Sequence, residues 1–252
     1  MARFDGAVCV VTGAARGIGL AIAQRLGDEG GRIACIDVSA DRLAAAVAGL
    51  TGAGIDARAY CADVGRRDAA REALSRVEED FRAPATVLIN NAAWARFQAL
   101  DAIDEVTVDR MFDVGLKGMI WTLQAAVPQM KRQGVGSVVN VCSIAALRGM
   151  ENSVAYAAMK AGVLGFTRAA AHELSAHRIR VNAIVPGMVG TQAALGQFDD
   201  ATIASRRAAM PLGRFGEPRE IAAAVAFLAG PEGSYIQGTA LVADGGWTVG
   251  VP

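Results

Sequence analysis

The sequence predicts a doubly wound α/β fold, in which helices cover both faces of a mostly parallel sheet. The main observation is a regular alternation between short apolar, β-branched runs and longer segments of helical pattern. The second is size, because 252 residues, of which 53% are hydrophobic, supply a core large enough for one open sheet. No linker, repeat or low-complexity segment interrupts the alternation, so we expect a single domain over residues 1–252.

The expected strands are short and end near polar or glycine-rich turns. They are Ala7–Thr12, Arg32–Asp37, Ala57–Cys61, Thr86–Asn90, Ser137–Cys142, Arg180–Val185 and Thr239–Val242. The helical segments lie between them: Gly17–Gly30, Ala40–Leu50, Arg66–Arg82, a long stretch after Asn90 that reaches Gln133 and that Pro128 interrupts, and Ser153–Ala176.

Charge, hydropathy and cysteine content exclude several functional classes. The 25 basic and 25 acidic residues balance without long runs, which predicts no nucleic-acid partner and no membrane-surface partner. No uncharged apolar run reaches about 18 residues, and the first strand begins too early for a signal peptide. Cys9, Cys35, Cys61 and Cys142 lie in strand-like runs without metal-ligand spacing. We expect them to be small buried hydrophobes, with no metal site and a cytoplasmic location.

The stretch from Ser143 to Lys160 carries the clearest chemical signal. Tyr156 and Lys160 stand four apart in an alanine-rich segment and therefore share one face of a helix. A free Tyr titrates near ~10 and a free Lys near ~10.4, so neither is a useful base at neutral pH alone. A nearby ammonium favours the phenolate, and we expect it to lower the pKa of Tyr156. Ser143 follows a buried strand, at the sheet edge where open α/β folds bind ligands.

A glycine cluster, Gly13-Ala-Ala-Arg16-Gly17-Ile-Gly19, follows the first expected strand. Glycines there allow a tight turn and the close approach of a pyrophosphate to the next helix N-terminus. Asp37, at the end of the second strand, is placed to accept hydrogen bonds from the adenosine ribose and to repel a 2′-phosphate. Arg16 favours NADP instead, because a guanidinium pairs with the 2′-phosphate. No basic residue follows Asp37 directly, so we expect NAD rather than NADP.

The active site of the short-chain dehydrogenase/reductase family resembles the group Ser143, Tyr156 and Lys160. The glycine cluster precedes this group in the order that the family shows. The resemblance covers nearly the whole chain, from Val10-Val-Thr-Gly to Asp244-Gly-Gly-Trp. It implies a Rossmann-type domain and an NAD(P)-dependent alcohol dehydrogenase or ketone reductase, which interconverts a secondary alcohol and a ketone by hydride transfer. It also implies a small-molecule substrate and a homotetramer with interfaces near residues 91–133 and 153–176.

The same resemblance assigns roles to individual residues. Tyr156 would be the general acid/base, Lys160 would lower its pKa and hold the nicotinamide ribose, and Ser143 would hydrogen-bond the reacting oxygen. The backbone of Val189 and the hydroxyl of Thr191 would hold the nicotinamide carboxamide. The complete set of expected cofactor-binding residues is Gly13, Arg16, Gly17, Ile18, Gly19, Asp37, Asp63, Val64, Asn90, Ala92, Tyr156, Lys160, Pro186, Gly187, Val189 and Thr191.

Two motifs at the ends of the third and fourth expected strands resemble those of the family. Asp63-Val64 resembles the family's adenine contact, and Asn90-Asn-Ala-Ala93 resembles its NNAG motif, with Ala93 in place of the glycine. We expect the Asn90 side chain to support the sheet rather than to touch the substrate.

Residues 192–212 are expected to form a substrate lid, since such segments vary among related folds. The lid carries Phe198, the pair Asp199-Asp200, the pair Arg206-Arg207 and Met210. The expected substrate-side residues are Trp94, Met150, Met188 and Phe198, and the wider pocket takes in Arg96, Met210 and Trp247.

Gly115 is the main departure from the family pattern, which has a catalytic Asn at this position. That Asn is understood to hold a water that links the Lys to solvent. A glycine inside a helix costs about 1 kcal/mol relative to alanine, but it leaves room for a water and for a helix distortion. We therefore expect a working proton relay and a slightly larger pocket. The alternatives are an NADPH-dependent ketoreductase, for example of acyl thioesters, and a cofactor-binding protein without turnover.

Overall fold

Seven strands pair in parallel to form one sheet, in the order β3-β2-β1-β4-β5-β6-β7. The computed structural model describes residues 2–196 and 199–249. The strands are β1 (Val8–Thr12), β2 (Arg32–Asp37), β3 (Ala57–Cys61), β4 (Ala85–Asn90), β5 (Gly136–Val141), β6 (Ile179–Pro186) and β7 (Ala240–Ala243). The strand order reverses between β1 and β4, which is where open α/β sheets bind ligands. The predicted fold class is confirmed, whereas the single-domain boundary stays a prediction.

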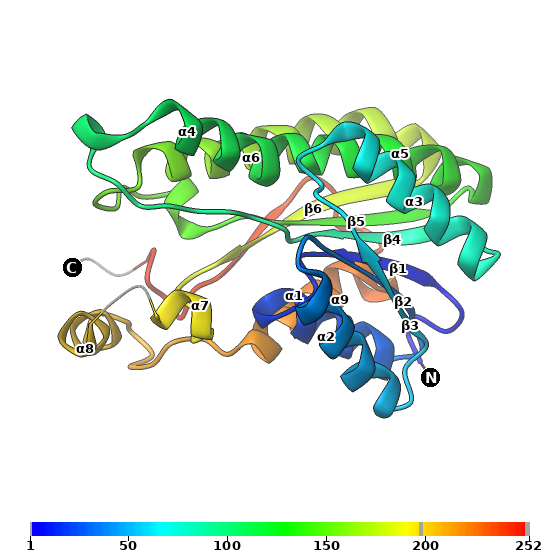
Figure 1. Ribbon diagram of the computed structural model, residues 1–252, viewed down its shortest axis with the longest axis horizontal. Coiled ribbons are helices and arrows are strands. Elements are labelled where there is room, and N and C mark those ends of the chain that lie inside the picture. Colours follow the sequence, from blue (N-terminus) through cyan, green and yellow to red (C-terminus); the bar gives the residue numbers. More distant parts are fainter. Residues whose placement is uncertain (1, 197–198, 250–252) are drawn as a thin grey trace.

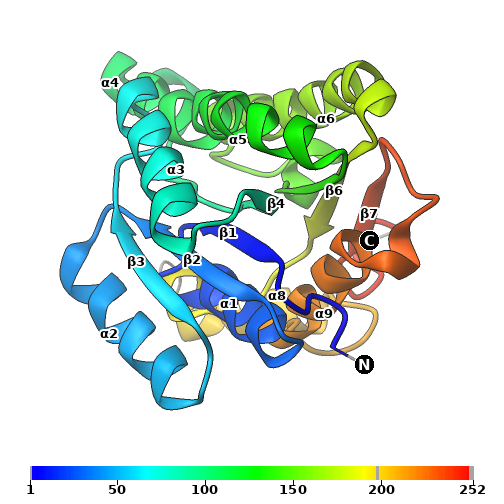
Figure 2. The ribbon, with the colours of Figure 1, turned by 90° about the vertical axis from the view of Figure 1, so that its right-hand side faces the viewer.

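Helices cover both faces of this sheet (Figures 1 and 2). One face carries α3 (Arg67–Phe81), α4 (Glu105–Phe112), α5 (Gly118–Gln133) and α6 (Val154–Leu174). The opposite face carries α1 (Gly17–Asp28), α2 (Ala40–Gly52) and α9 (Pro218–Ala229). Two short helices, α7 (Gln192–Leu195) and α8 (Asp200–Ala208), follow the carboxyl end of β6 and lie beyond the sheet edge (Figure 1).

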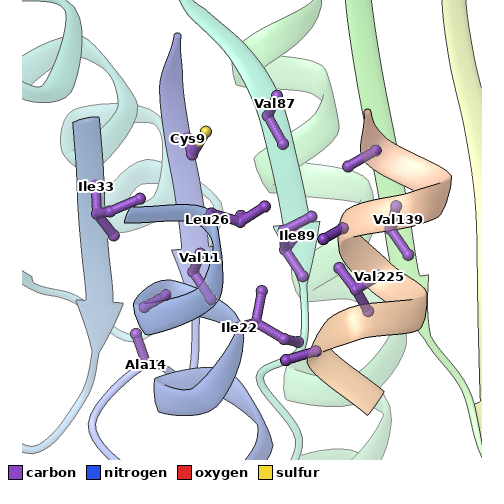
Figure 3. Packing of buried hydrophobic residues seen from close by; sticks show 14 of the residues in the cluster. Cys9, Val11, Ala14, Ile22, Leu26, Ile33, Val87, Ile89, Val139 and Val225 are labelled. Carbon is purple, nitrogen blue, oxygen red and sulfur yellow. The ribbon is translucent and has the colours of Figure 1, made fainter. Parts of the chain in front are cut away.

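The core between the sheet and the pair α1 and α9 fixes the first strand and the turn that follows it (Figure 3). Ile22 and Leu26 from α1 and Val225 from α9 are fully buried against Val11 and Ile89 of the sheet. Parallel strands buried on both faces read as continuous apolar runs, which is why the sequence predicts them well.

A buried polar network joins the central strands to the helices of the opposite face. Asn90 Nδ2 donates to Asn140 Oδ1 at 2.9 Å, and Thr122 Oγ1 donates to Asn90 Oδ1 at 2.7 Å. Asn140 Nδ2 in turn donates to Thr167 Oγ1 at 3.0 Å. The network ties β4, β5, α5 and α6 together, so the expectation that Asn90 supports the sheet is confirmed.

The region between β4 and β5 differs from the prediction of one long helical stretch. Residues 91–99 contain no helix, and a π-helical turn, Asp113–Lys117, joins α4 to α5. Pro128 lies inside α5 and does not interrupt it. Beyond the proline, Gln129 accepts from Ala85 N at 2.8 Å and donates to Leu74 O at 3.0 Å, so tertiary packing holds the helix across the lost backbone bond.

Two further findings differ from the prediction. Helix α9 was not predicted, although its Glu217–Glu220 capping box and Pro218 in the first turn are regular helix-start signals. Cys61 is exposed rather than buried, because it ends β3 near the sheet edge. Cys9, Cys35 and Cys142 are buried, as expected. Among the described residues, no helix is long and apolar enough to cross a membrane.

Candidate active site

Two cavities lie side by side at the carboxyl edge of the sheet. The larger, about 520 Å³, is lined by Gly13, Asp37 and Asp63 among others. The smaller, about 280 Å³, is lined by residues that include Ser143 and Lys160. The residues that line both are Ile18, Asn91, Ala93, Tyr156, Thr191 and Ala194. A ligand that fills the larger cavity therefore contacts residues that also line the smaller one.

Ser143, Tyr156 and Lys160 meet in the smaller cavity, as the sequence pattern predicts. Ser143 follows β5, and its Oγ accepts from Ala145 N at 3.2 Å, which fixes the turn. Tyr156 and Lys160 lie one turn apart on α6. The Lys160 side chain is buried and donates to Val141 O at 2.9 Å, with Nζ 5.9 Å from the centre of the Tyr156 ring.

Burial dominates the electrostatics of this group and disfavours every charged form. It lowers the pKa of Lys160 to about 8. It raises the pKa of Tyr156, against the opposing effect of a hydrogen bond with the Ser143 hydroxyl. It also raises the pKa of the neighbouring Cys142 thiol. Burial therefore sets the direction of the Tyr156 pKa in the protein alone, and the expectation that Lys160 lowers this pKa stays a prediction.

Phe97 is a neighbour of Tyr156 that sequence reasoning missed. Its ring meets the Tyr156 ring edge-on, with centroids 5.2 Å apart, and it lines the smaller cavity. The contact restricts the Tyr156 ring and shields it from one side. Phe97 belongs to the irregular segment after β4, which shows no periodic signal in the sequence.

The turn between β1 and α1 has the shape that a phosphate site requires. Gly13 has φ +65°, and a Cβ on Gly19 would lie 2.1 Å from Gly13 O, so a side chain is excluded there. Helix α1 has no side-chain cap, and its N-terminus opens at the larger cavity through Arg16, Gly17 and Ile18. The free N–H groups and positive dipole end favour an anion at this point. These residues fit a dinucleotide pyrophosphate.

Asp37 is held in place at the far end of the larger cavity. Its Oδ2 accepts from Ala15 N at 3.2 Å, and its Oδ1 accepts from Ser39 N at 3.0 Å. A carboxylate oxygen has a further lone pair, so both oxygens can still accept from ribose hydroxyls. Arg16 and Arg42 line the same cavity, and the sequence analysis did not single out Arg42.

The remaining cofactor candidates divide into cavity residues and supporting residues. Asp63 and Val64 line the larger cavity, where Arg110 donates to Asp63 Oδ2 at 2.8 Å and fixes the carboxylate. Ala92 lines it too, whereas the Asn90 side chain is used in the sheet network and is not among the lining residues. The neighbouring Asn91 reaches both cavities.

The loop after β6 forms the wall between the cavities. Pro186, Gly187 and Val189 line the smaller cavity, and Thr191 lines both. Thr191 caps α7, with its Oγ1 accepting from Ala194 N at 3.1 Å, so its hydroxyl hydrogen is available to donate.

The substrate-side candidates lie in different parts of the site. Met150 and Met188 line the smaller cavity, whereas Trp94 lines the larger one, and their contacts with a substrate stay predictions. Phe198 lies outside the described residues. Arg206 and Trp247 also line the smaller cavity. Arg206 comes from α8, where no sequence signal distinguishes it from Arg207.

Known proteins are similar to this chain in sequence and in fold. Residues 13–248 match the family model described as enoyl-(acyl carrier protein) reductase. The chain is 37% identical to the 3-oxoacyl-[acyl-carrier-protein] reductase of Thermotoga maritima, over 98% of this chain and 100% of that protein. The chain belongs to the short-chain dehydrogenase/reductase family. It is also 38% identical to a galactitol 2-dehydrogenase (L-tagatose-forming) of Cereibacter sphaeroides, over 98% of this chain and 97% of the relative.

A solved member of the family has nearly the same backbone. The gluconate 5-dehydrogenase of Burkholderia cenocepacia, in complex with NADP and tartrate, superposes with a TM-score of 0.94 at 28% identity and covers 99% of this chain and 98% of its own. Relatives named as dehydrogenases and reductases support an NAD(P)-dependent alcohol or ketone oxidoreductase at the general level.

This member of the short-chain dehydrogenase/reductase family differs at Gly115. The expected helix distortion is present, because Gly115 lies in the π-helical turn. The expected room for a water beside Gly115 stays a prediction. A Cβ at position 115 would lie 2.6 Å from Sδ and 2.7 Å from Cε of Met159, the buried residue that precedes Lys160. Met159 therefore fills the direction in which a side chain at position 115 would extend.

Proposed function

We propose that the protein is an NAD(H)-dependent oxidoreductase that interconverts a secondary alcohol and a ketone, with Tyr156 as general acid/base. One observation carries the proposal: Tyr156 lines both cavities, with Ser143 and Lys160 beside it in the smaller one. A substrate oxygen in the smaller cavity thus meets a proton donor at the boundary with the cofactor cavity.

The residues around the larger cavity fit a dinucleotide. The N-terminus of α1 would hold the pyrophosphate, Asp37 the adenosine ribose, and Val189 and Thr191 the carboxamide side of the nicotinamide. When bound, the nicotinamide accepts hydride from the alcohol carbon or returns it to the ketone.

The chain itself handles the proton and the oxygen. The raised pKa of Tyr156 keeps its hydroxyl protonated at neutral pH, ready to donate to a ketone oxygen. Ser143 would donate a second hydrogen bond to the same oxygen as negative charge develops on it. Lys160, held against Val141 O, would favour the phenolate when Tyr156 has given up its proton. Phe97 holds the Tyr156 ring in position.

Asp37 supports NAD over NADP. Its two oxygens are oriented by Ala15 N and Ser39 N, and a 2′-phosphate placed against them would bring like charges together. The second candidate is an NADPH-dependent ketoreductase. It is favoured by Arg16 and Arg42, which line the same cavity and could pair with that phosphate, and by the similarity to 3-oxoacyl-[acyl-carrier-protein] reductase.

The test is a broad panel of secondary alcohols and ketones, assayed with NAD(H) and NADP(H) by the absorbance of the reduced nicotinamide. The proposal predicts turnover, with a higher kcat/KM for NAD(H). Turnover only with NADP(H) would establish the ketoreductase alternative. Binding of either cofactor without any turnover, followed by activity in Gly115→Asn alone, would establish the non-catalytic alternative.

A further inference from the structure

The charge of the smaller cavity is unbalanced. Among its described lining residues, Lys160 and Arg206 carry positive charge and none is Asp or Glu. The other lining residues are apolar or neutral, and the raised pKa of Cys142 keeps that thiol protonated. Among the side chains that the structure describes, a substrate in this cavity therefore meets cationic groups and no anionic one.

The two cations are held differently. Lys160 is buried below Tyr156 and already donates to Val141 O at 2.9 Å. Arg206 comes from the last turn of α8 in the lid and is half-buried. The next residue, Arg207, is exposed, does not line the cavity, and stacks on Phe215 with its guanidinium 5.5 Å from the ring centre. Of the two adjacent arginines, Arg206 is therefore the one that lines the smaller cavity.

Arg206 is also separate from the cofactor phosphate site. The N-terminus of α1 opens into the larger cavity, whose lining includes Arg16 and Arg42 but not Arg206. A guanidinium stays charged at any pH at which the protein functions, and it binds carboxylate or phosphate through paired hydrogen bonds. In a cavity that a substrate closes to water, such a pairing gains strength.

We propose that Arg206 binds an anionic group of the substrate, so that the protein acts on small secondary alcohols and ketones that carry a carboxylate or a phosphate. The volume of about 280 Å³ lies just below the usual range of ligand pockets, roughly 300–1,000 Å³, and favours a compact substrate. This inference rests on the proposed function, because it names the substrate class of the same site.

The experiment compares each anionic ketone with a neutral partner. The carboxylate–amide pairs differ in charge but hardly in shape, whereas the phosphate pair also differs by the phosphate group itself. Levulinate is paired with levulinamide, acetoacetate with acetoacetamide, and dihydroxyacetone phosphate with dihydroxyacetone. The first two pairs test a carboxylate at two chain lengths, and the third tests a phosphate. Each is assayed for kcat and KM with the preferred reduced cofactor, in the wild type, Arg206→Met, Arg206→Lys and Arg207→Met.

The wild type should prefer at least one anionic ketone over its neutral partner. Arg206→Met should raise KM for that anion about 10- to 100-fold, the range for loss of a charge-assisted hydrogen bond. It should change KM for the neutral partner by less than about threefold, since that substrate makes no ion pair. Arg206→Lys should recover part of the loss, because it keeps the charge but not the paired geometry. Arg207→Met should behave as the wild type.

A binding measurement separates this inference from the proposed function. Calorimetric titration of the anionic ketones into the protein saturated with oxidised cofactor should show binding that Arg206→Met abolishes, whether or not turnover occurs. One outcome is that the protein turns over neutral ketones while Arg206→Met leaves the ratio of kcat/KM between each anionic ketone and its neutral partner unchanged. That result would overturn the inference and leave the proposed function intact. A weaker affinity of Arg206→Met for the cofactor alone would also overturn it, since Arg206 would then serve the dinucleotide.

Discussion

Helices α6 and α8 both contribute side chains to the smaller cavity, but the protein holds them in different ways. Helix α6 buries eight residues, Lys160 among them, and packs along β6. Helix α8 buries none, and the lid rests on a small cluster formed by Met188, Met210 and Phe215. The groups that we propose to move protons are thus fixed by the core, whereas the group that we propose to select the substrate lies on an element with little burial. Such a division lets substrate preference change without loss of the fold.

The largest expected contrast between α6 and α8 is in how much each contributes to the free energy of unfolding. Met159→Ala removes a fully buried side chain from the core behind Tyr156 and should lower the free energy of unfolding by about 2–5 kcal/mol. Ile203→Ala trims a partly buried side chain of α8 and should cost less than about 1 kcal/mol. Urea unfolding of both variants measures the contrast. Equal losses would mean that the lid belongs to the same cooperative core.

The cofactor side of the site can be changed without touching either helix. Asp37→Ala removes a ribose acceptor and the repulsion of a 2′-phosphate, so the NAD-to-NADP ratio of kcat/KM should fall by about 100-fold. Arg16 and Arg42 then remain to attract the phosphate. Asp41→Ala, at an exposed position in the first turn of α2, is the control and should leave the ratio unchanged. A wild type that already prefers NADP would refute the assignment of NAD.

Substitutions of two glycines test how tightly the residues around Met159 are packed. Gly115→Ala places a methyl group against Met159 and should destabilise the protein by about 1–2 kcal/mol, the scale of overpacking. Gly165→Ala, inside α6, meets no atom within 4 Å and should stabilise by about 0.5–1 kcal/mol through helix propensity. Thermal and urea unfolding give both values. Stabilisation by Gly115→Ala would show that Met159 yields and that the space can be filled.

The buried Lys160 should make stability depend on pH. Between pH about 8 and the ordinary lysine pKa of 10.5, the unfolded chain binds the proton that the folded chain has lost. The contribution of Lys160 to stability therefore rises with pH across this window. Tyr156 and Cys142 act in the opposite direction. The informative quantity is therefore the difference in the free energy of unfolding between the wild type and Lys160→Met.

That difference should move in favour of the wild type as the pH rises from about 7 to about 10. Lys131→Met, which removes an exposed lysine of α5, supplies the matched control and should show a much flatter difference. A flat difference for Lys160→Met as well would show that burial does not lower the pKa of Lys160.

The sequence predicts the fixed part of the protein much better than the lid and its surroundings. The strands, the glycine turn and the Ser143–Tyr156–Lys160 group follow from apolar runs, from glycines with special backbone needs and from fixed spacing on one helix. Phe97 and Arg206 come from segments whose positions depend on tertiary packing, so no local pattern marks them. The same holds for Met159, because only packing shows that it fills the space beside Gly115.

The role proposed for Tyr156, to carry the proton between the substrate and the chain, is tested by Tyr156→Phe, assayed for turnover and, by calorimetry, for binding of NAD(H). We expect unchanged folding and cofactor affinity together with a fall in kcat of at least about 100-fold, the usual scale for loss of a general acid/base. Near-normal turnover in this variant would show that another group carries the proton and that Tyr156 does not.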